Sequence, residues 1–115
     1  MKIKKVKYTK KAKLKLFGMA QVESKLRKAG LKKLEDLIFK DGRHYVGEVK
    51  RGNKIKKIAP HGIGFMVWPD GSSYGGNFFD GKFDEFGEYE DHKGKKKMGI
   101  WRDGKFLYEQ KEDEF

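Results

Sequence analysis

The chain has 115 residues, of which 39% are charged and 37% hydrophobic, and its formal net charge at pH 7 is +11. This length corresponds to one domain with a modest core, and the aromatic residues, 14% of the chain, can supply much of the apolar area that the core needs. The absence of cysteine excludes disulfides and thiolate metal sites and fits a reducing, intracellular compartment, and no apolar run is long enough for a transmembrane helix or a secretory signal.

Residues 1–17 form a lysine-rich basic arm. Residues 1–40 contain 14 Lys and Arg against 3 acidic residues, whereas residues 41–108 contain 13 against 10, so the excess positive charge lies in the first third. Within the arm "AKLKLF" alternates like a strand, although this lysine density predicts disorder for the isolated segment. We expect the arm to contact an acidic surface, with a solvated tail as the alternative. The lysines assigned to this contact are Lys2, Lys4, Lys5, Lys7, Lys10, Lys11, Lys13 and Lys15.

Residues 18–34 predict a capping helix. Four apolar residues from Met19 to Ala29 recur at helical spacing, and Gly30 suits a helix C-terminus. We expect this short amphipathic helix to cover an open end of the sheet that follows, because an uncovered edge invites association. Residues 37–39 predict the first strand.

Residues 35–108 contain an internal repeat. Its units begin at Asp41, Asp70 and Lys93, and each unit has glycine at offsets one, six and eleven from its start. The starts are separated by 29 and 23 residues, and the two spacings become equal when six residues within 53–60 are treated as an insertion. A period in the twenties is typical of arrays in which each repeat is one supersecondary element.

The spacing within a unit predicts a β-hairpin. Offsets four, six and eight lie on one face of a strand and carry ring, glycine and ring in the second unit. A glycine between rings leaves space over the backbone that an aromatic side chain from a neighbouring strand can cover, and the Asp-Gly pairs predict turns. The fold class is therefore mainly β, one curved antiparallel sheet of repeated hairpins with a short N-terminal helix. The structural glycines are Gly47, Gly52, Gly62, Gly64, Gly76, Gly81, Gly87, Gly99 and Gly104.

These units resemble the MORN repeat family. "YVGEVKRG" with "HGIGFMVWPDG" carries the resemblance in the first unit, and "YGGNFFDGKFDEFGEYED" carries it in the second. "MGIWRDGKF" supplies a partial third unit, so the similarity covers residues from about 36 to 106. Three departures stand out, because Val49 replaces a ring, Glu85 replaces a glycine and Lys97 replaces the tyrosine.

The aromatic face of the sheet allows two interpretations. Its rings either pack the protein's own thin core or line a concave groove for a partner's helix or extended segment, which is what the MORN resemblance implies. The docking interpretation requires that at least one ring other than Tyr89 be accessible. The assigned rings are Tyr45, Tyr74, Phe78, Tyr89 and Trp101.

The sequence offers little support for catalysis. His44, His61 and His92 share no metal-ligand spacing, and His61 occupies the turn position that the repeat family uses. The acidic residues 84–90 lack the regular oxygen spacing of a calcium loop, and neither a P-loop nor a nucleophile motif is present. We therefore expect no enzyme, no cofactor, no metal and no small-molecule substrate.

From these observations we predict that the chain is a structural or adaptor protein of a larger assembly. The repeats would dock a protein partner, while the basic arm contacts RNA, an acidic protein or anionic lipid. The alternatives are membrane-surface binding to anionic phospholipids and RNA binding in a small ribonucleoprotein. The apolar residues of the arm are irregularly placed for an interfacial helix, and its rings are sparse for base stacking. Residues 109–115 are expected to form an exposed acidic tail.

Overall fold

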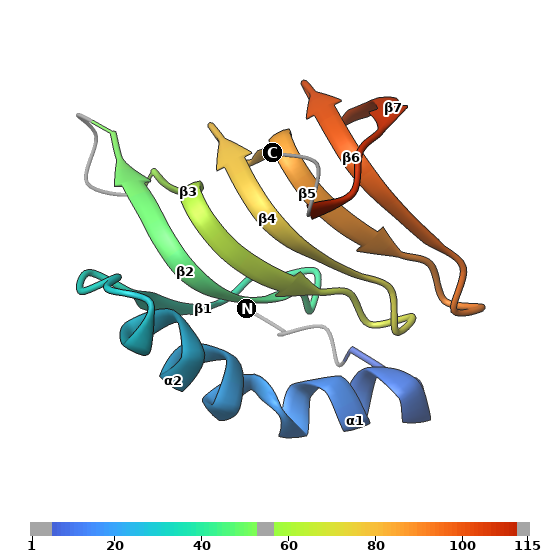
Figure 1. Cartoon of the computed structure of the whole chain (residues 1–115). Helices are drawn as coiled ribbons and strands as arrows, with labels where there is room; N and C mark the ends of the chain where they lie inside the picture. Colours follow the sequence, from blue (N-terminus) through green and yellow to red (C-terminus); the bar gives the residue numbers. More distant parts are fainter. Residues whose placement is uncertain (1–5, 53–56, 113–115) are drawn as a thin grey trace.

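A computed structural model describes residues 6–52 and 57–112 and places a single curved sheet beside two short helices (Figure 1). In this part of the chain the sheet has seven antiparallel strands, and their order in the sheet is their order in the sequence. The elements are α1 (Lys10–Phe17), α2 (Met19–Lys28), β1 (Glu35–Ile38), β2 (His44–Arg51), β3 (Ile58–Val67), β4 (Ser73–Phe79), β5 (Lys82–Glu90), β6 (Lys96–Arg102) and β7 (Lys105–Glu109). The predicted fold class is confirmed.

The N-terminal segment differs from the strand-like alternation of "AKLKLF", because residues 10–17 form a helix. Thr9 caps α1 by accepting a hydrogen bond from the backbone N–H of Ala12. Lys, Leu and Ala are good helix formers, and Ala12 is fully buried against the rest of the molecule. Tertiary packing therefore decides the conformation of a segment that was expected to be disordered in isolation.

A helix, α2, is observed within residues 18–34, where the sequence predicted one, but it lies along a face of the sheet against β2 and not over an open end. Gly30 has a φ of 102° and donates its N–H to the carbonyl of Arg27, so the expected glycine ends the helix. The two helices lie along one face of the sheet, with α1 against β3 and α2 against β2 (Figure 1). Val46 and Val67, buried on this side, alternate with Tyr45 and Met66, which therefore point to the opposite face.

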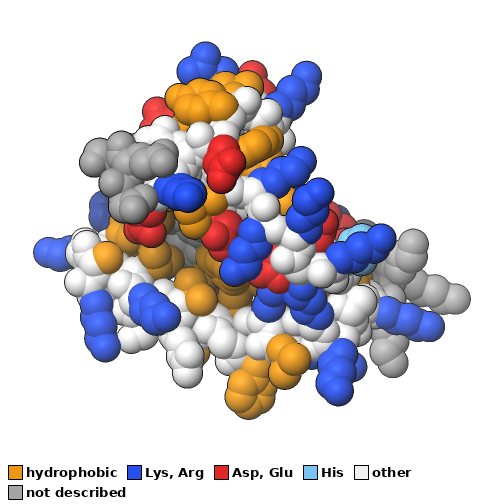
Figure 2. Space-filling model, turned by 45° about the vertical axis from the view of Figure 1, so that its right-hand side comes forward, with side chains coloured by type: hydrophobic (Ala, Val, Ile, Leu, Met, Phe, Trp, Pro, Cys, Tyr) orange, Lys and Arg blue, Asp and Glu red, His pale blue; other side chains and the backbone are white. Residues whose placement is uncertain are grey.

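The residues before α1 run across the turns of successive hairpins. The Tyr8 hydroxyl donates to the carbonyl of Gly42, 2.8 Å away, in the first turn, and the Thr9 N–H donates to the carbonyl of Pro69 in the second. The amine of Lys15, on α1, donates to the carbonyl of Gly71, 2.7 Å away. Lys and Arg side chains are widespread on the surface (Figure 2), yet this part of the basic arm is fixed to the sheet.

The turns have the same geometry at equivalent positions of the repeat. Gly42, Gly71 and Gly94 all have positive φ, and each donates its N–H to the carbonyl of the residue three positions before it. A second kind of turn lies in the middle of each of the two later units, at Asp80-Gly81 and Asp103-Gly104, where both residues have positive φ. This geometry is that of a two-residue hairpin turn, for which Asp-Gly is a preferred pair.

The tyrosines at offset four explain why glycine is needed on the neighbouring strand. Gly47 faces Gly64 across β2 and β3, and a Cβ at Gly64 would clash with the ring of Tyr45. The Tyr45 hydroxyl donates to the carbonyl of Glu48 at 2.6 Å, where the strand register shifts by a bulge. The hydroxyl thus satisfies a carbonyl that the bulge removes from regular pairing.

The second unit repeats this arrangement. Gly76 faces Gly87, and a Cβ at Gly87 would clash with the ring of Tyr74. The Tyr74 hydroxyl donates to the carbonyl of Asn77 at 3.0 Å, beside another register shift. A ring from the neighbouring strand covers Gly64 and Gly87 on the returning strands. At Gly47 and Gly76, where the sequence predicted such covering, an added Cβ would instead meet the backbone of the facing strand.

Candidate protein-docking site

Four of the five rings assigned to partner docking form the protein's own core. Tyr45, Tyr74, Phe78 and Trp101 are between 0% and 5% exposed. The expectation that one of them is accessible is therefore wrong, and so is the interpretation of these four rings as a groove for a partner. The rings cover one another, mostly edge to face, and a sheet with one helical layer has no other apolar layer to cover this face.

Hydrogen bonds hold the buried rings in place. Trp101 donates its indole N–H to the carbonyl of Gly87 at 3.0 Å. Burial raises the pKa of the Tyr45 and Tyr74 phenols well above the usual range, so both hydroxyls remain protonated donors. The core rings are consequently a rigid framework.

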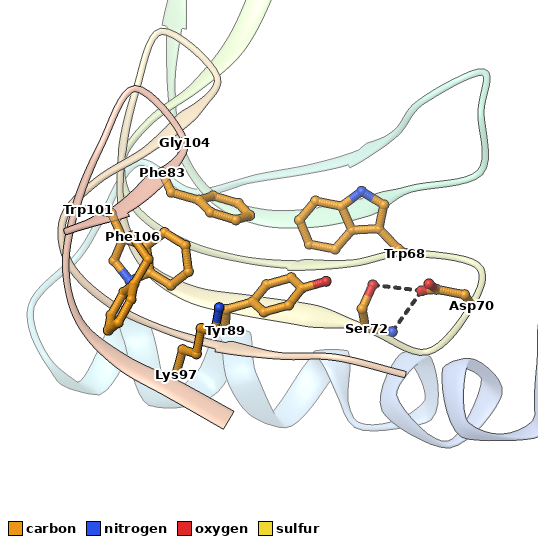
Figure 3. A pocket seen from close by; sticks show the side chains of 9 residues that line it. All are labelled: Trp68, Asp70, Ser72, Phe83, Tyr89, Lys97, Trp101, Gly104 and Phe106. Carbon is orange, nitrogen blue, oxygen red and sulfur yellow. Dashed lines mark hydrogen bonds between the residues drawn. The ribbon is translucent and has the colours of Figure 1, made fainter. Parts of the chain in front are cut away.

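An aromatic pocket opens beside this core, at the end of the sheet formed by the last two units (Figure 3). Its volume is about 560 Å³. The lining comes from the turn between β3 and β4 and from β5, β6 and the hairpin between β6 and β7. The lining residues are Trp68, Asp70, Ser72, Phe83, Tyr89, Lys97, Trp101, Gly104 and Phe106. We call this site the aromatic pocket.

The walls of the aromatic pocket are held by ring contacts. Phe83 packs edge to face against both Trp68 and Trp101, with centroid distances of 5.7 and 5.3 Å. Phe106 lies 4.9 Å from Trp101 on the other side. Rings that are fixed before a ligand arrives lose little conformational freedom on binding, which favours affinity.

The pocket lies where the third unit carries Lys97 at the position that Tyr74 has in the second unit. In the second unit Tyr74 stacks on Phe83 with a centroid distance of 3.8 Å and nearly parallel planes. The equivalent pair in the third unit is Lys97 and Phe106, and here the amine lies 5.7 Å from the ring centroid. A slender aliphatic chain fills less space than a ring, so the volume above Phe106 stays open.

Charges of both signs border the pocket. Asp70 accepts hydrogen bonds from the N–H and hydroxyl of Ser72, as Figure 3 shows. Burial alone would raise the pKa of Asp70, but these bonds outweigh it and hold the pKa below its usual range, so the carboxylate is anionic. Lys97 carries the opposite charge across the pocket. The pocket thus combines an apolar floor with two polar groups that can orient a ligand.

Two of the rings predicted to dock a partner line this pocket. Tyr89 is half-buried, and Trp101 is buried. Trp68, Phe83 and Phe106 also line the pocket but were not predicted as site residues. The missed signal was the repeat itself, because Phe83 and Phe106 both lie at offset thirteen, 23 residues apart. A ring recurring at that offset follows the second turn of each unit and faces the same side as the core.

The basic arm divides into two groups of lysines. Lys11 and Lys15 face the sheet and pair with Glu90 at 2.7 and 3.4 Å. The hydrogen bond from Lys11 holds the pKa of Glu90 below its usual range, whereas burial lowers the pKa of Lys15. The exposed lysines are Lys7, Lys10 and Lys13. Lys2, Lys4 and Lys5 lie outside the described residues, as does most of the insertion at 53–58.

The histidines serve local roles. His61 accepts a hydrogen bond from the backbone N–H of Asp80 through Nδ1, and His44 packs edge to face on Tyr8. Within residues 6–52 and 57–112, no group of His, Asp and Glu side chains is arranged to hold a metal ion. Over the same residues, neither helix is long and apolar enough to cross a membrane.

Comparison with known proteins gives a partial match. An alignment of 55 residues, covering 40% of this chain, is 42% identical to Alsin from rat, mouse and human. Alsin contains MORN repeats. The chain spans only 3% of the length of these relatives, and no family model matches it. The similarity agrees with the hairpin repeats seen in the structure.

Proposed function

We propose that this chain is a non-catalytic MORN-type interaction module that docks a protein partner through the aromatic pocket. The observation that carries the proposal is the open pocket itself, with its fixed rings and with Asp70 and Lys97 at its border. Aromatic and aliphatic anchors inserted into such pockets typically dominate the energy of protein interfaces. The similarity to a segment of Alsin supports the same class of module.

The chemistry of the pocket defines the partner segment. A helix or extended segment carrying one large apolar anchor would place that side chain between Trp68 and Phe106. A carboxylate or carbonyl near the anchor would meet Lys97, and a donor would meet Asp70. This pattern is that of a short protein motif, and it suits an adaptor subunit within a larger intracellular assembly.

A peptide-display selection followed by NMR tests the proposal. The selection should yield peptides that share an apolar anchor. Both tryptophans of the chain line the pocket, but Trp101 is buried with its indole N–H bonded to the carbonyl of Gly87, whereas Trp68 is half-buried. Addition of a selected peptide should therefore shift the indole N–H signal of Trp68 more than that of Trp101.

The matched variants are Phe106→Ala and Leu107→Ala on β7. Phe106 lines the pocket, whereas Leu107 is 51% exposed and lies outside the pocket lining. Peptide affinity should fall about tenfold or more in Phe106→Ala and stay unchanged in Leu107→Ala. Equal affinities for the two variants, or selected peptides that perturb residues remote from Trp68, would contradict docking in the pocket.

A further inference from the structure

The outward face of α1 is an apolar pair flanked by lysines. Lys10, Lys13, Leu14 and Phe17 are spaced as i, i+3, i+4 and i+7, which places them on one side of the helix. All four are exposed, and Leu14 and Phe17 are 68% and 92% exposed. We call these four residues the outer stripe. It lies outside the repeats and away from the aromatic pocket.

The inward face of α1 fixes the direction in which the outer stripe points. Ala12 is fully buried, and the amines of Lys11 and Lys15 reach Glu90. The amine of Lys15 also donates to the Ser73 hydroxyl at 2.9 Å. These contacts orient the helix, so the outer stripe cannot turn inward without breaking them.

The outer lysines carry uncompensated charge. Neither Lys10 nor Lys13 forms an ion pair with any described residue, in contrast to Lys11 and Lys15 on the inner side. Lys7, just before the helix, is also exposed. At the bottom of the molecule, where Figure 1 places α1, Figure 2 shows projecting hydrophobic side chains with Lys and Arg side chains near them. Positive charge thus surrounds an apolar projection.

We propose that the outer stripe of α1 docks on the surface of an anionic phospholipid bilayer. Leu14 and Phe17 insert at the boundary between headgroups and acyl chains, while Lys7, Lys10 and Lys13 contact the acidic headgroups. Exposed apolar side chains bordered by lysines are the pattern of helices that lie on such membranes. Neither signal alone gives stable attachment, and together they give reversible binding.

In the sequence, the irregular placement of the arm's apolar residues argues against an interfacial helix, and the fold of α1 answers this argument. The apolar residues of the arm are irregular along the chain, but α1 turns Leu16 partly inward and leaves Leu14 and Phe17 side by side outside. An apolar pair on the outer stripe favours lipid over RNA, because phosphate contact requires no exposed leucine. The helices lie on the face opposite the ring core, so a membrane-bound molecule keeps the aromatic pocket open to a partner (Figure 1).

Vesicle sedimentation with the full chain tests the proposal. Wild-type protein should bind phosphatidylcholine vesicles that contain phosphatidylserine, bind pure phosphatidylcholine much less, and dissociate as salt is raised. Leu14→Ser/Phe17→Ser should lose most of this binding, and Lys10→Glu/Lys13→Glu should weaken it about tenfold or more. The controls are Ile38→Ser and Lys105→Glu, at exposed positions on β1 and β7, which should bind as wild type does.

A Phe17→Trp variant reports insertion directly, since its fluorescence should shift to the blue when anionic vesicles are added. Unaltered vesicle binding by Leu14→Ser/Phe17→Ser would overturn the proposal. Failure of the wild type to bind anionic vesicles would also overturn it. If a short RNA binds instead, and Lys10→Glu/Lys13→Glu abolishes RNA binding, the basic surface contacts nucleic acid and the proposal is likewise wrong. The NMR response of Trp68 to a selected peptide should survive in all outer-stripe variants, which separates this surface from the pocket.

Discussion

The second repeat unit carries Tyr74 at the position where the third unit carries Lys97, and these side chains lie over equivalent rings, Phe83 and Phe106. In the second unit the tyrosine is fully buried and its hydroxyl satisfies a backbone carbonyl. In the third unit the lysine leaves the aromatic pocket open. The side chain at this one position therefore distinguishes a hairpin that is filled with core from a hairpin that borders an open pocket.

Exchanging the two side chains is the strongest test of this comparison. Tyr74→Lys removes a fully buried ring and places an amine among aromatic side chains. We expect the free energy of unfolding to fall by about 3–5 kcal/mol, which is enough to unfold a small domain. Urea unfolding followed by circular dichroism measures the effect. A loss below about 1 kcal/mol would show that the ring is not part of the core.

The glycine beneath Tyr74 gives the next largest effect. A Cβ at Gly87 would clash with the tyrosine ring, so Gly87→Ala should cost about 2–3 kcal/mol. Gln110 stands 23 residues later, where the third unit has no tyrosine above it, and Gln110→Ala should change stability by less than about 0.5 kcal/mol. Thermal melts of the two variants compare the positions, and similar shifts would contradict the ring-over-glycine arrangement.

A smaller effect distinguishes the first and second units. Gly62 in the first unit has a φ of 100°, and its counterpart Glu85 has a φ of 56°, which is strained for a side chain. Glu85→Gly should raise the free energy of unfolding by about 0.5–1 kcal/mol. Glu88→Gly, at an ordinary φ on the same strand, should instead lower it by about 0.5–1 kcal/mol. Urea unfolding of both variants should give opposite signs.

The reverse exchange, Lys97→Tyr, should have the smallest effect on stability, within about 1 kcal/mol, because the new ring enters a space that is already open. Its effect on binding should be large. We expect affinity for a selected peptide to fall at least about tenfold as the ring occupies the anchor site. Lys96→Tyr is the control, since the neighbouring residue of β6 points to the other face. Unchanged affinity in Lys97→Tyr would place docking elsewhere.

Sequence periodicity was sufficient for the hairpins but not for the division between core and site. The Asp-Gly turns and the glycines at fixed offsets depend on local backbone geometry, so they could be predicted. Whether Trp101 is buried or open depends on which other rings reach it, and Phe83 and Phe106 approach it from different strands. The sequence shows that Lys97 departs from the repeat pattern at offset four. That this departure borders an open pocket can be seen only in the structure.

The helical state of residues 10–17 was beyond local reasoning for a similar reason. The alternation of lysines and apolar residues is typical of a strand, and the lysine density predicts disorder in isolation, but the burial of Ala12 and the ion pair with Glu90 stabilise a helix. Glu90 lies far along the chain, at the end of β5. No window of the sequence around the arm contains the partner that decides its structure.

A sheet in which every strand is hydrogen-bonded only to its sequence neighbours should unfold from its ends, because each unit gains stability mainly from the units beside it. The segment from Tyr8 to Lys15 changes this behaviour, since it bonds to the turns of the first and second units and to Glu90 at the end of β5. Because these contacts connect several units, the units should unfold cooperatively. Amide hydrogen exchange should therefore be uniformly slow across β2 to β5 in the full chain, and graded toward the ends once residues 1–17 are removed.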